Sequence, residues 1–366
     1  MRLKTILSIY LGFRCLELFC QAPTYGMAAQ FGFIAPHNPE MVRLITGHSF
    51  GFSAHADWQT NGKANWQADY YYPSHRLDYI FIHTGNLKQL GFQHALTYQI
   101  RLPLDRAINR QQLLLGLGPA YATKKWDIDS NRQGFVLGSH FNMALILGYQ
   151  YVFLRKSTFE TSIGLRVTHL SNGAFTMPNA GTNQVGVQIE CNFGKKSTGF
   201  VASKRDTLPK WQGALIGSAG LKEIQPPNSR KYSVLSLQNQ WIYQVNRKSS
   251  FVSQLDFMAN TSNPIIEAEN EGLLTKQKTR AMCGLTFGYL LRFGKIGLSM
   301  QQGIYVIDPY GYNGLLYHRV GLRTYSSGPI FFHLALKTHF AKADHGEIGI
   351  GYTFYRKGLL NQREKI

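Results

Sequence analysis

The chain has 366 residues, of which 44% are apolar and only 16% charged, and its formal net charge is +19. A charged fraction below the roughly 25% of soluble globular proteins, together with 20 tyrosines and 36 glycines, is typical of outer-membrane barrels. The positive charge predicts an anionic partner such as lipid or lipopolysaccharide, and nucleic acid is not expected, because no nucleic-acid-binding motif or basic stripe is present.

The N-terminus predicts a secretory signal. Met1 to Lys4 is short and basic, residues 5–13 are mostly apolar, and small residues near Ala22 or Ala28 offer cleavage positions. We therefore expect residues 1–22 to be a signal peptide, which would also remove two of the four cysteines.

The two remaining cysteines, Cys191 and Cys283, fall on apolar faces of predicted strands, where cysteine behaves as a small hydrophobic residue. A disulfide between them is possible but not favoured. The chain has no C-x-x-C motif and no clustered His/Cys spacing. We therefore expect neither a metal site nor a cofactor.

Apolar and polar residues alternate along most of the chain, with turn signals between the segments, which predicts antiparallel strands. In the clearest segments, residues 141–153 and 281–293, a row of Phe, Tyr and Leu alternates with a row rich in Gly, Asn, Gln and Thr. A soluble sandwich or barrel alternates too, but it packs its apolar row inside. Strands are expected over residues 49–58, 66–72, 77–83, 90–102, 112–122, 141–153, 160–169, 184–193, 211–221, 232–245, 251–258, 281–293, 296–301, 315–325, 330–340 and 348–354.

This pattern predicts an all-β fold, an antiparallel transmembrane β-barrel with an even number of about 12–16 strands. We favour one barrel, in which residues 23–199 contribute the N-terminal strands and residues 200–366 complete the same wall. The alternative is two smaller barrels in tandem, joined through the polar, basic residues 195–209.

The strand that begins near Glu160 ends in the string His169-Leu170-Ser171-Asn172. Successive side chains of a strand point to opposite faces, so His169 and Ser171 continue the row of apolar residues that precedes them. We expect both side chains to face the lipid, which suits a nucleophile and a base that act on a lipid.

The string from His169 to Gly173, with Pro178 to Asn183 before the next strand, resembles the active-site hairpin of the PagL-type lipid A deacylases, relatives of which are labelled acyloxyacyl hydrolases. The resemblance is strongest over residues 158–193, and the second half of the chain extends past the compact eight-stranded members. It implies an outer-membrane barrel that removes an ester-linked acyl chain from lipid A. Carried over by motif, Ser171 is the nucleophile, His169 its base, and Asn172 a contributor to the oxyanion hole.

One position departs from the family pattern. Members place a glutamate after the loop to orient the histidine, whereas Asn183 stands there in this chain. Asn183 has the parity that faces it toward His169, and an amide oxygen can accept a hydrogen bond from an imidazole. Glu190 has the opposite parity and lies about 23 Å along an extended strand, so it cannot substitute.

Basic loop residues are candidates for contacts with the phosphates of lipid A, namely Lys124, Lys125 and Arg132. A merely solvated loop is the alternative interpretation. The G-x-S-x-G match at residues 47–51 is interpreted as a coincidence, because that nucleophile elbow needs a following helix and the pattern there predicts a strand.

The sequence thus predicts a cell outer-membrane serine esterase with lipid A as its substrate. A rival hypothesis is a barrel for passage or structure, in which His169 and Ser171 are inert. A third hypothesis, a soluble basic binding protein, differs by predicting extraction without detergent.

Overall fold

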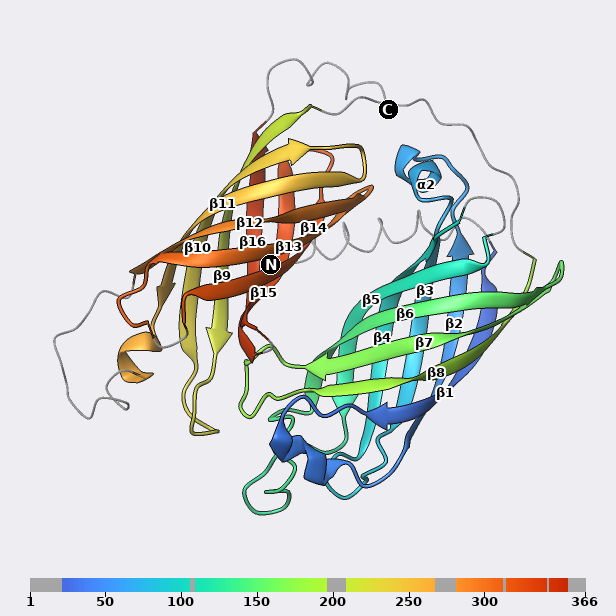
Figure 1. Ribbon diagram of the computed structural model, residues 1–366, viewed down its shortest axis with the longest axis horizontal. Coiled ribbons are helices and arrows are strands. Elements are labelled where there is room, and N and C mark those ends of the chain that lie inside the picture. The colour runs from blue at the N-terminus through green and yellow to red at the C-terminus, as the bar shows by residue number, and fades with distance from the viewer. Residues whose placement is uncertain are drawn as a thin grey trace, which may run out of the picture. The chain divides into compact units, whose positions relative to one another are not determined.

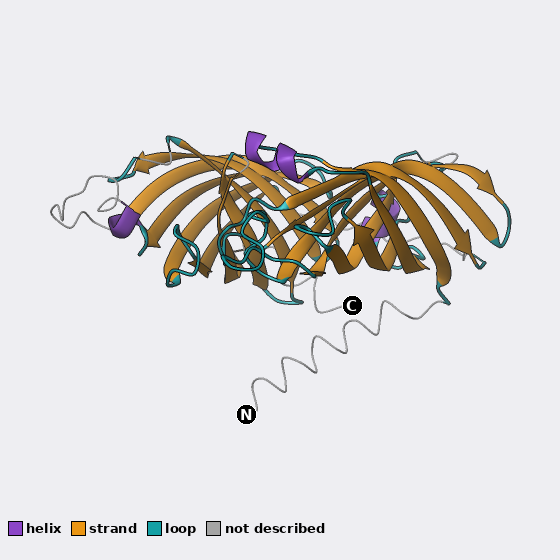
Figure 2. Ribbon diagram, turned by 90° about the horizontal axis from the view of Figure 1, so that it is seen from below, coloured by secondary structure: helices purple, strands orange, loops and turns teal. Residues whose placement is uncertain are grey.

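The computed structural model describes residues 22–105, 109–195, 209–266, 281–311, 314–340 and 342–354. Strands make up most of these residues, and the helices are short (Figure 2). Within the described ranges, no helix has the length and hydropathy to cross a membrane. All but the last residue of the predicted signal peptide lies outside the described residues, as do Cys15 and Cys20.

The strands form two closed barrels, each built from eight antiparallel strands in chain order (Figure 1). The first barrel consists of β1 (Thr24–Ile34), β2 (Ser49–Gln59), β3 (Ser74–His83), β4 (Phe92–Pro103), β5 (Gln111–Ala122), β6 (Phe141–Arg155), β7 (Phe159–Ser171) and β8 (Thr182–Phe193). The second consists of β9 (Trp211–Lys222), β10 (Tyr232–Gln244), β11 (Ser249–Asn260), β12 (Ala281–Phe293), β13 (Ile296–Ile307), β14 (Leu316–Tyr325), β15 (Ile330–His339) and β16 (Lys342–Phe354).

The favoured single barrel is wrong, and the tandem alternative is correct. The first barrel closes where β1 pairs with β8, and the second where β16 pairs with β9. Alternation of side chains is the same in a wall of any strand number, whereas closure depends on which strands pair last, and no local pattern specifies that pairing. The chain divides into two compact units, Met1–Ser171 with Gly181–Ser203 and Asn172–Ala180 with Lys204–Ile366.

Two strand predictions also need correction. Residues 66–72 are not a strand, because α2 (Asn65–Asp69) and a following turn occupy the β2–β3 connection. The strand β1 was not predicted, although its residues alternate, with Met27 and Phe31 exposed and Ala28 and Gln30 buried. Ala28 pairs with Ser53 and Glu190, so cleavage there would remove half of β1, and only cleavage near Ala22 leaves the barrel intact.

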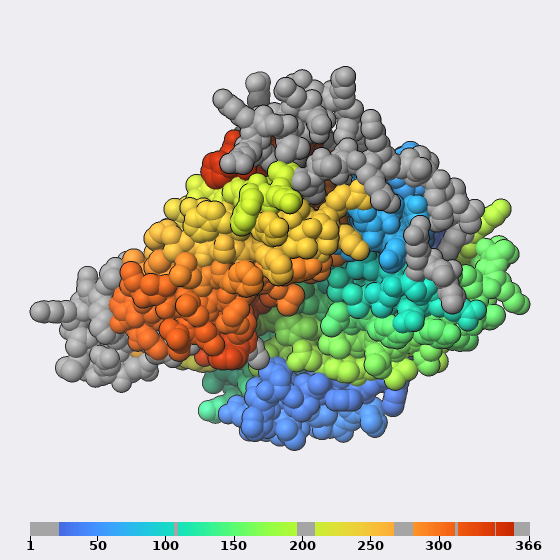
Figure 3. Space-filling model, turned by 45° about the horizontal axis from the view of Figure 1, so that its top comes forward, coloured from blue at the N-terminus to red at the C-terminus, as the bar shows by residue number. Residues whose placement is uncertain are grey.

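The walls have their apolar side chains outside and their polar side chains inside. On β6, Phe141 is 77% exposed and Asn142 only 6%, and on β12 Phe287 is 61% exposed and Thr286 only 5%. The space-filling view in Figure 3 shows part of the outer wall of each barrel. This arrangement is the reverse of a soluble barrel and confirms the predicted direction of both rows.

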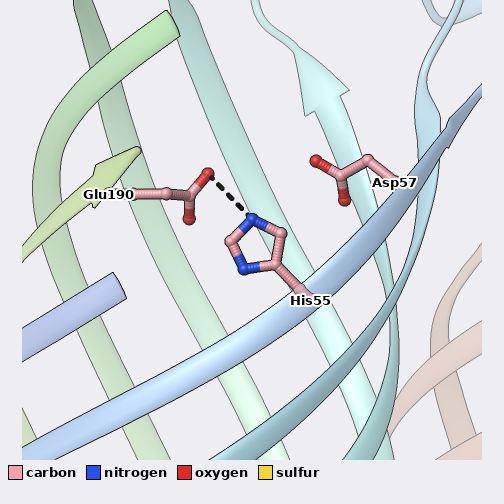
Figure 4. Close-up of side chains that lie close together, drawn as sticks. All are labelled: His55, Asp57 and Glu190. Carbon is pink, nitrogen blue, oxygen red and sulfur yellow. Dashed lines mark ion pairs between the residues drawn. The ribbon is translucent and has the colours of Figure 1, made fainter. Parts of the chain in front are cut away.

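A network of buried charges fills the first barrel. The guanidinium of Arg76 donates to Asp57 and to Glu190, each with a shortest N···O distance of 2.7 Å. His55 also lies between these two acids, with Nε2 3.8 Å from Glu190 Oε1 (Figure 4). These three side chains could approach one cation, but Arg76 already occupies both carboxylates. Glu190 thus faces the lumen, as its parity predicted.

The second barrel has a charge network of its own. Arg319 contacts Asp256 at 3.3 Å and is also paired with Glu347, while Lys337 lies 2.9 Å from Asp344. The hydroxyl of Tyr317 donates to Asp256 over 2.6 Å. An eight-stranded barrel is just wide enough for side chains to fill its interior. Buried polar and charged side chains line both lumens.

Candidate active site

The hairpin of β7 and β8 brings three polar side chains together on the outside of the first barrel. The register pairs His169 with Asn183 and Leu170 with Thr182. Leu170 and Thr182 point inward and are fully buried, so the intervening His169, Ser171 and Asn183 point outward, where each is half-buried. The parity expected from the sequence is therefore the one observed.

The three side chains form a continuous hydrogen-bonded chain. His169 Nε2 lies 3.0 Å from Ser171 Oγ, and His169 Nδ1 lies 2.6 Å from Asn183 Oδ1. Because an amide oxygen can only accept, His169 Nδ1 carries the proton and Nε2 presents its lone pair to the serine hydroxyl. This is the tautomer in which a histidine acts as general base toward serine.

Gly181 leaves the space that the imidazole needs. Its φ is +78°, and a Cβ placed on it would lie 2.9 Å from His169 Cε1 and 3.4 Å from Ser171 Cβ. Glycine adopts this left-handed conformation without a steric penalty. Any other residue would strain the turn and push against the base.

Asn172 follows Ser171, but its hydrogen-bonding groups are engaged within the turn. Its main-chain N–H donates to Asn179 Oδ1 over 2.9 Å, and its side-chain amide donates to the carbonyl of Thr176 over 3.0 Å. The side-chain oxygen accepts from the Thr176 N–H at 3.3 Å. Asn172 therefore organises the turn, and in this arrangement its N–H is not aimed at a substrate.

The hairpin ends at a rim formed by the loops that follow β1, β3, β5 and β7. Two main-chain hydrogen bonds attach neighbouring loops to it: Gly181 N–H donates to Val136 O over 3.0 Å, and Ala35 N–H donates to Asn183 O over 2.7 Å. The guanidinium of Arg43 stacks 5.0 Å above the ring of Phe135. The three candidate catalytic side chains thus lie at the edge of a rim whose loops are hydrogen-bonded to the hairpin.

The three basic residues predicted for phosphate contacts lie on the β5–β6 loop of this rim, and Lys124 and Arg132 are exposed while Lys125 is half-buried. The same loop carries acids. Hydrogen bonds from the N–H and hydroxyl of Ser130 hold the pKa of Asp127 below its ordinary value, so this carboxylate stays ionised and offsets part of the positive charge.

The site holds one further residue that the sequence did not predict. His37, in the loop after β1, places Nδ1 3.1 Å from Asn183 Nδ2. No spacing rule could have found it, because 146 positions separate the two residues and only closure of the barrel through β1 and β8 brings them together.

Exposed apolar side chains surround the polar group. Met143 and Leu145 of β6 pair with Ser171 and His169 and are 40% and 44% exposed. Phe33 on β1 is 46% exposed. An acyl chain that reaches Ser171 can therefore lie along an apolar wall.

Comparison with known families gives two adjacent matches. The model described as "Lipid A 3-O-deacylase (PagL)" matches residues 48–192, and the one described as "Acyloxyacyl hydrolase, C-terminal domain" matches residues 210–357. The first range falls within the first barrel, and the second range covers all eight strands of the second barrel. No curated protein matches the chain.

Solved structures with some likeness include two porins and the protein CdiB. The NanC porin is 6% identical with a TM-score of 0.18, over 91% of this chain and 99% of that chain. A triple mutant of the Rhodopseudomonas blastica porin is 8% identical with a TM-score of 0.18, over the same two shares of 91% and 99%. CdiB from Acinetobacter baumannii is 10% identical with a TM-score of 0.21, over 91% of this chain and 60% of that chain. Scores this low carry no argument about function.

Proposed function

Because the chain belongs to the PagL and acyloxyacyl hydrolase family, whose two models together match most of its length, we propose that it is an outer-membrane serine esterase that removes an ester-linked acyl chain from lipid A. One observation carries the proposal. Ser171, His169 and Asn183 are hydrogen-bonded in series on the outward, apolar side of the wall.

The geometry supports a two-stage reaction. Ser171 Oγ attacks the ester carbonyl carbon while His169 Nε2 takes the hydroxyl proton. The C–O bond to the sugar breaks, the imidazolium returns its proton to the departing sugar hydroxyl, and the acyl group stays on Ser171. His169 then deprotonates a water that attacks the acyl carbonyl. The fatty acid leaves, and the serine regains its proton.

The negative oxygen that develops on the carbonyl needs hydrogen-bond donors. The N–H of Asn172 is adjacent to Ser171 but is hydrogen-bonded to Asn179. We assign Asn172 to the oxyanion hole on the condition that the oxyanion replaces Asn179 as the acceptor of this N–H. The Asn172 side chain keeps its bonds to Thr176 and so holds the turn while the main-chain donor is exchanged.

Placement in the outer membrane is supported by the side chains of the two walls, which are apolar on the outside and polar on the inside. Exposed Phe, Tyr, Leu and Ile follow one another around both barrels, while buried Gln, Arg, Asp and Glu line the lumens. In water, an apolar surface this extensive would drive aggregation, whereas in a bilayer it is satisfied by lipid. Lys124, Lys125 and Arg132 would lie at the headgroup level and contact phosphates.

The rival function of a channel is less well supported. Passage needs an open lumen, and eight-stranded barrels leave little room once their side chains are placed. In the first barrel, Arg76 bridges Asp57 and Glu190 across the interior, so a solute would have to break buried ion pairs.

The test uses the purified full-length protein in mixed micelles with lipid A, and mass spectrometry follows released fatty acid and shortened lipid A. Wild type should release acyl chains, and Ser171→Ala should lose at least about 10³-fold in rate. Ser253→Ala is the matched control, because Ser253 also points outward, from β11 of the second barrel. Equal yields from wild type and Ser171→Ala would end the serine mechanism.

A further inference from the structure

The carboxamide of Asn183 is hydrogen-bonded on two sides. One partner is His169, and the other is a residue outside the proposed triad. Its Oδ1 lies 2.6 Å from His169 Nδ1, and its Nδ2 lies 3.1 Å from His37 Nδ1. His37 thus extends the series Ser171, His169, Asn183 by a fourth member. Any role of His37 in turnover rests on the proposed esterase function.

An asparagine creates a problem of orientation that a carboxylate does not have. Both oxygens of a carboxylate accept, so either can face the histidine, whereas a carboxamide has one accepting oxygen and one donating NH₂ group. If the Asn183 amide were reversed, its NH₂ would face His169 Nδ1 and require a lone pair there. The proton would then lie on Nε2, and His169 could not take the proton of Ser171.

We propose that His37 is a positioning residue that selects the productive orientation of the Asn183 carboxamide. A neutral imidazole in water prefers the proton on Nε2, so an exposed histidine such as His37 offers the lone pair of Nδ1. This lone pair accepts from Asn183 Nδ2, which directs Oδ1 toward His169. The reversed orientation would leave the His37 lone pair facing an oxygen.

The backbone around His37 is fixed on both sides. Two residues earlier, the Ala35 N–H donates to the carbonyl of Asn183 over 2.7 Å. One residue later, Asn38 caps the short helix η2 (Pro39–Leu44), its side-chain oxygen accepting from the Met41 N–H over 3.0 Å. Met41 and Leu44 of η2 are buried. The backbone of His37 therefore lies between two anchored points, and placing its ring beside Asn183 costs little further backbone entropy.

Asn183, which stands where the family has a glutamate, and His37 are then functionally linked. The amide needs an acceptor behind it because it is not symmetric. A carboxylate at the same position would not need one. This dependence distinguishes a positioning role from a merely structural contact, which would matter equally with either residue.

The experiment measures four full-length proteins: wild type, His37→Phe, Asn183→Asp and the double variant. A fluorophosphonate reports the nucleophilicity of Ser171 through its labelling rate, and lipid A supplies kcat and KM. With the orienting acceptor gone, only a fraction of molecules keeps the productive amide, so His37→Phe should lower labelling and kcat by about tenfold and leave KM unchanged. In the Asn183→Asp background, the same change should cost less than about twofold.

His48→Phe is the matched control, since His48 lies in the same loop and is exposed, and its ring lies 5.2 Å from that of Phe31 in a tilted arrangement. It should behave as wild type. Equal losses from His37→Phe in both backgrounds, a loss confined to KM, or full labelling of His37→Phe would each overturn the positioning role and leave the esterase intact. If Ser171 of the wild type were neither labelled nor needed for acyl release, the proposed function itself would fail.

Discussion

The last hairpin of each barrel occupies the same topological position, yet among the described residues only the first carries a candidate site. In the first barrel, β7 and β8 are joined by a long turn, and His169 faces outward against Ser171. In the second, β15 and β16 are joined by a short connection, and His339 Nε2 bonds the buried hydroxyl of Tyr305 at 2.9 Å. Lys337 and Asp344 lie in the same buried network.

The difference between these hairpins lies in side-chain direction and turn length, because the walls themselves are alike. Both barrels have apolar exteriors and buried arginines paired with carboxylates. A histidine near the rim is therefore not enough. It must continue the apolar row, and a turn with a left-handed glycine must fold back beside it.

The largest difference in activity between the two hairpins is expected when their histidines are replaced. His169→Ala removes the proposed base and should lower acyl release by at least about 10³-fold. His339→Ala removes a ring from a lumen network and should leave release nearly unchanged. The measurement is initial rate of fatty-acid release by mass spectrometry. A comparable loss in His339→Ala would mean that the second barrel contributes to the chemistry.

In contrast to the hairpins, the two lumens should respond alike when a buried arginine is removed. Arg76→Leu leaves the buried Asp57 and Glu190 with Arg101 as their remaining arginine partner. Loss of the bridging guanidinium should lower the free energy of unfolding by about 3 kcal/mol, the low end for a broken buried pair. Arg319→Leu removes the arginine that pairs with Glu347 and Asp256 in the second barrel, and it should have a similar effect. Urea unfolding in detergent measures both. As a control, Arg155→Leu removes an arginine whose side chain is 35% exposed, and its partner Glu160 keeps Arg101 at 3.5 Å. This change should cost less than about 1 kcal/mol, and equal costs for all three variants would contradict this account.

A methyl group tests the space beside the base. Gly181→Ala introduces a Cβ 2.9 Å from His169 Cε1 at a φ of +78°, so acyl release should fall by roughly 10- to 100-fold through strain of about 1–3 kcal/mol. Gly217→Ala on β9 is the control, because its added Cβ meets nothing within 4 Å. If both variants kept the wild-type rate, the tight fit around the imidazole would be irrelevant to turnover.

Asn183→Asp should raise activity. A carboxylate stabilises the imidazolium that forms during attack more than an amide does, and we expect an increase in kcat of up to about tenfold. Single-turnover acyl release measures this effect. Asn239→Asp, at an outward position of β10, controls for the added charge. A fall in kcat for Asn183→Asp alone would show that the amide, with its donor, is needed.

The smallest effect is expected from the loop charges. Alanine at Lys124, Lys125 or Arg132 should raise KM by about two- to fivefold at low salt and by less at high salt, because exposed charges are screened. Lys295→Ala, on the exposed β12–β13 turn of the second barrel, should leave KM unchanged. A salt-independent change in KM would indicate that these residues act by packing and not by charge.

Much of the site could be predicted because it depends on local rules. The strand period fixed the direction of His169, Ser171 and Asn183, and the hairpin register then set Asn183 directly opposite His169. The same parity excluded Glu190, which the structure places among lumen charges. The hydrogen bonds of Asn172 could not be predicted, because the partners of its main-chain N–H and side-chain amide depend on how the turn folds back on itself.

The sequence by itself determined the alternation of the walls, their apolar exterior and the composition of the candidate catalytic hairpin, because a strand turns each successive side chain to the opposite face. Tertiary structure alone decided that sixteen strands close as two barrels and that His37 meets Asn183. The first closure and the contact of His37 depend on the pairing of β1 with β8, and the second closure depends on the pairing of β16 with β9. Such pairing is selected by the free energy of the whole closed sheet, which leaves no trace in a short stretch of sequence.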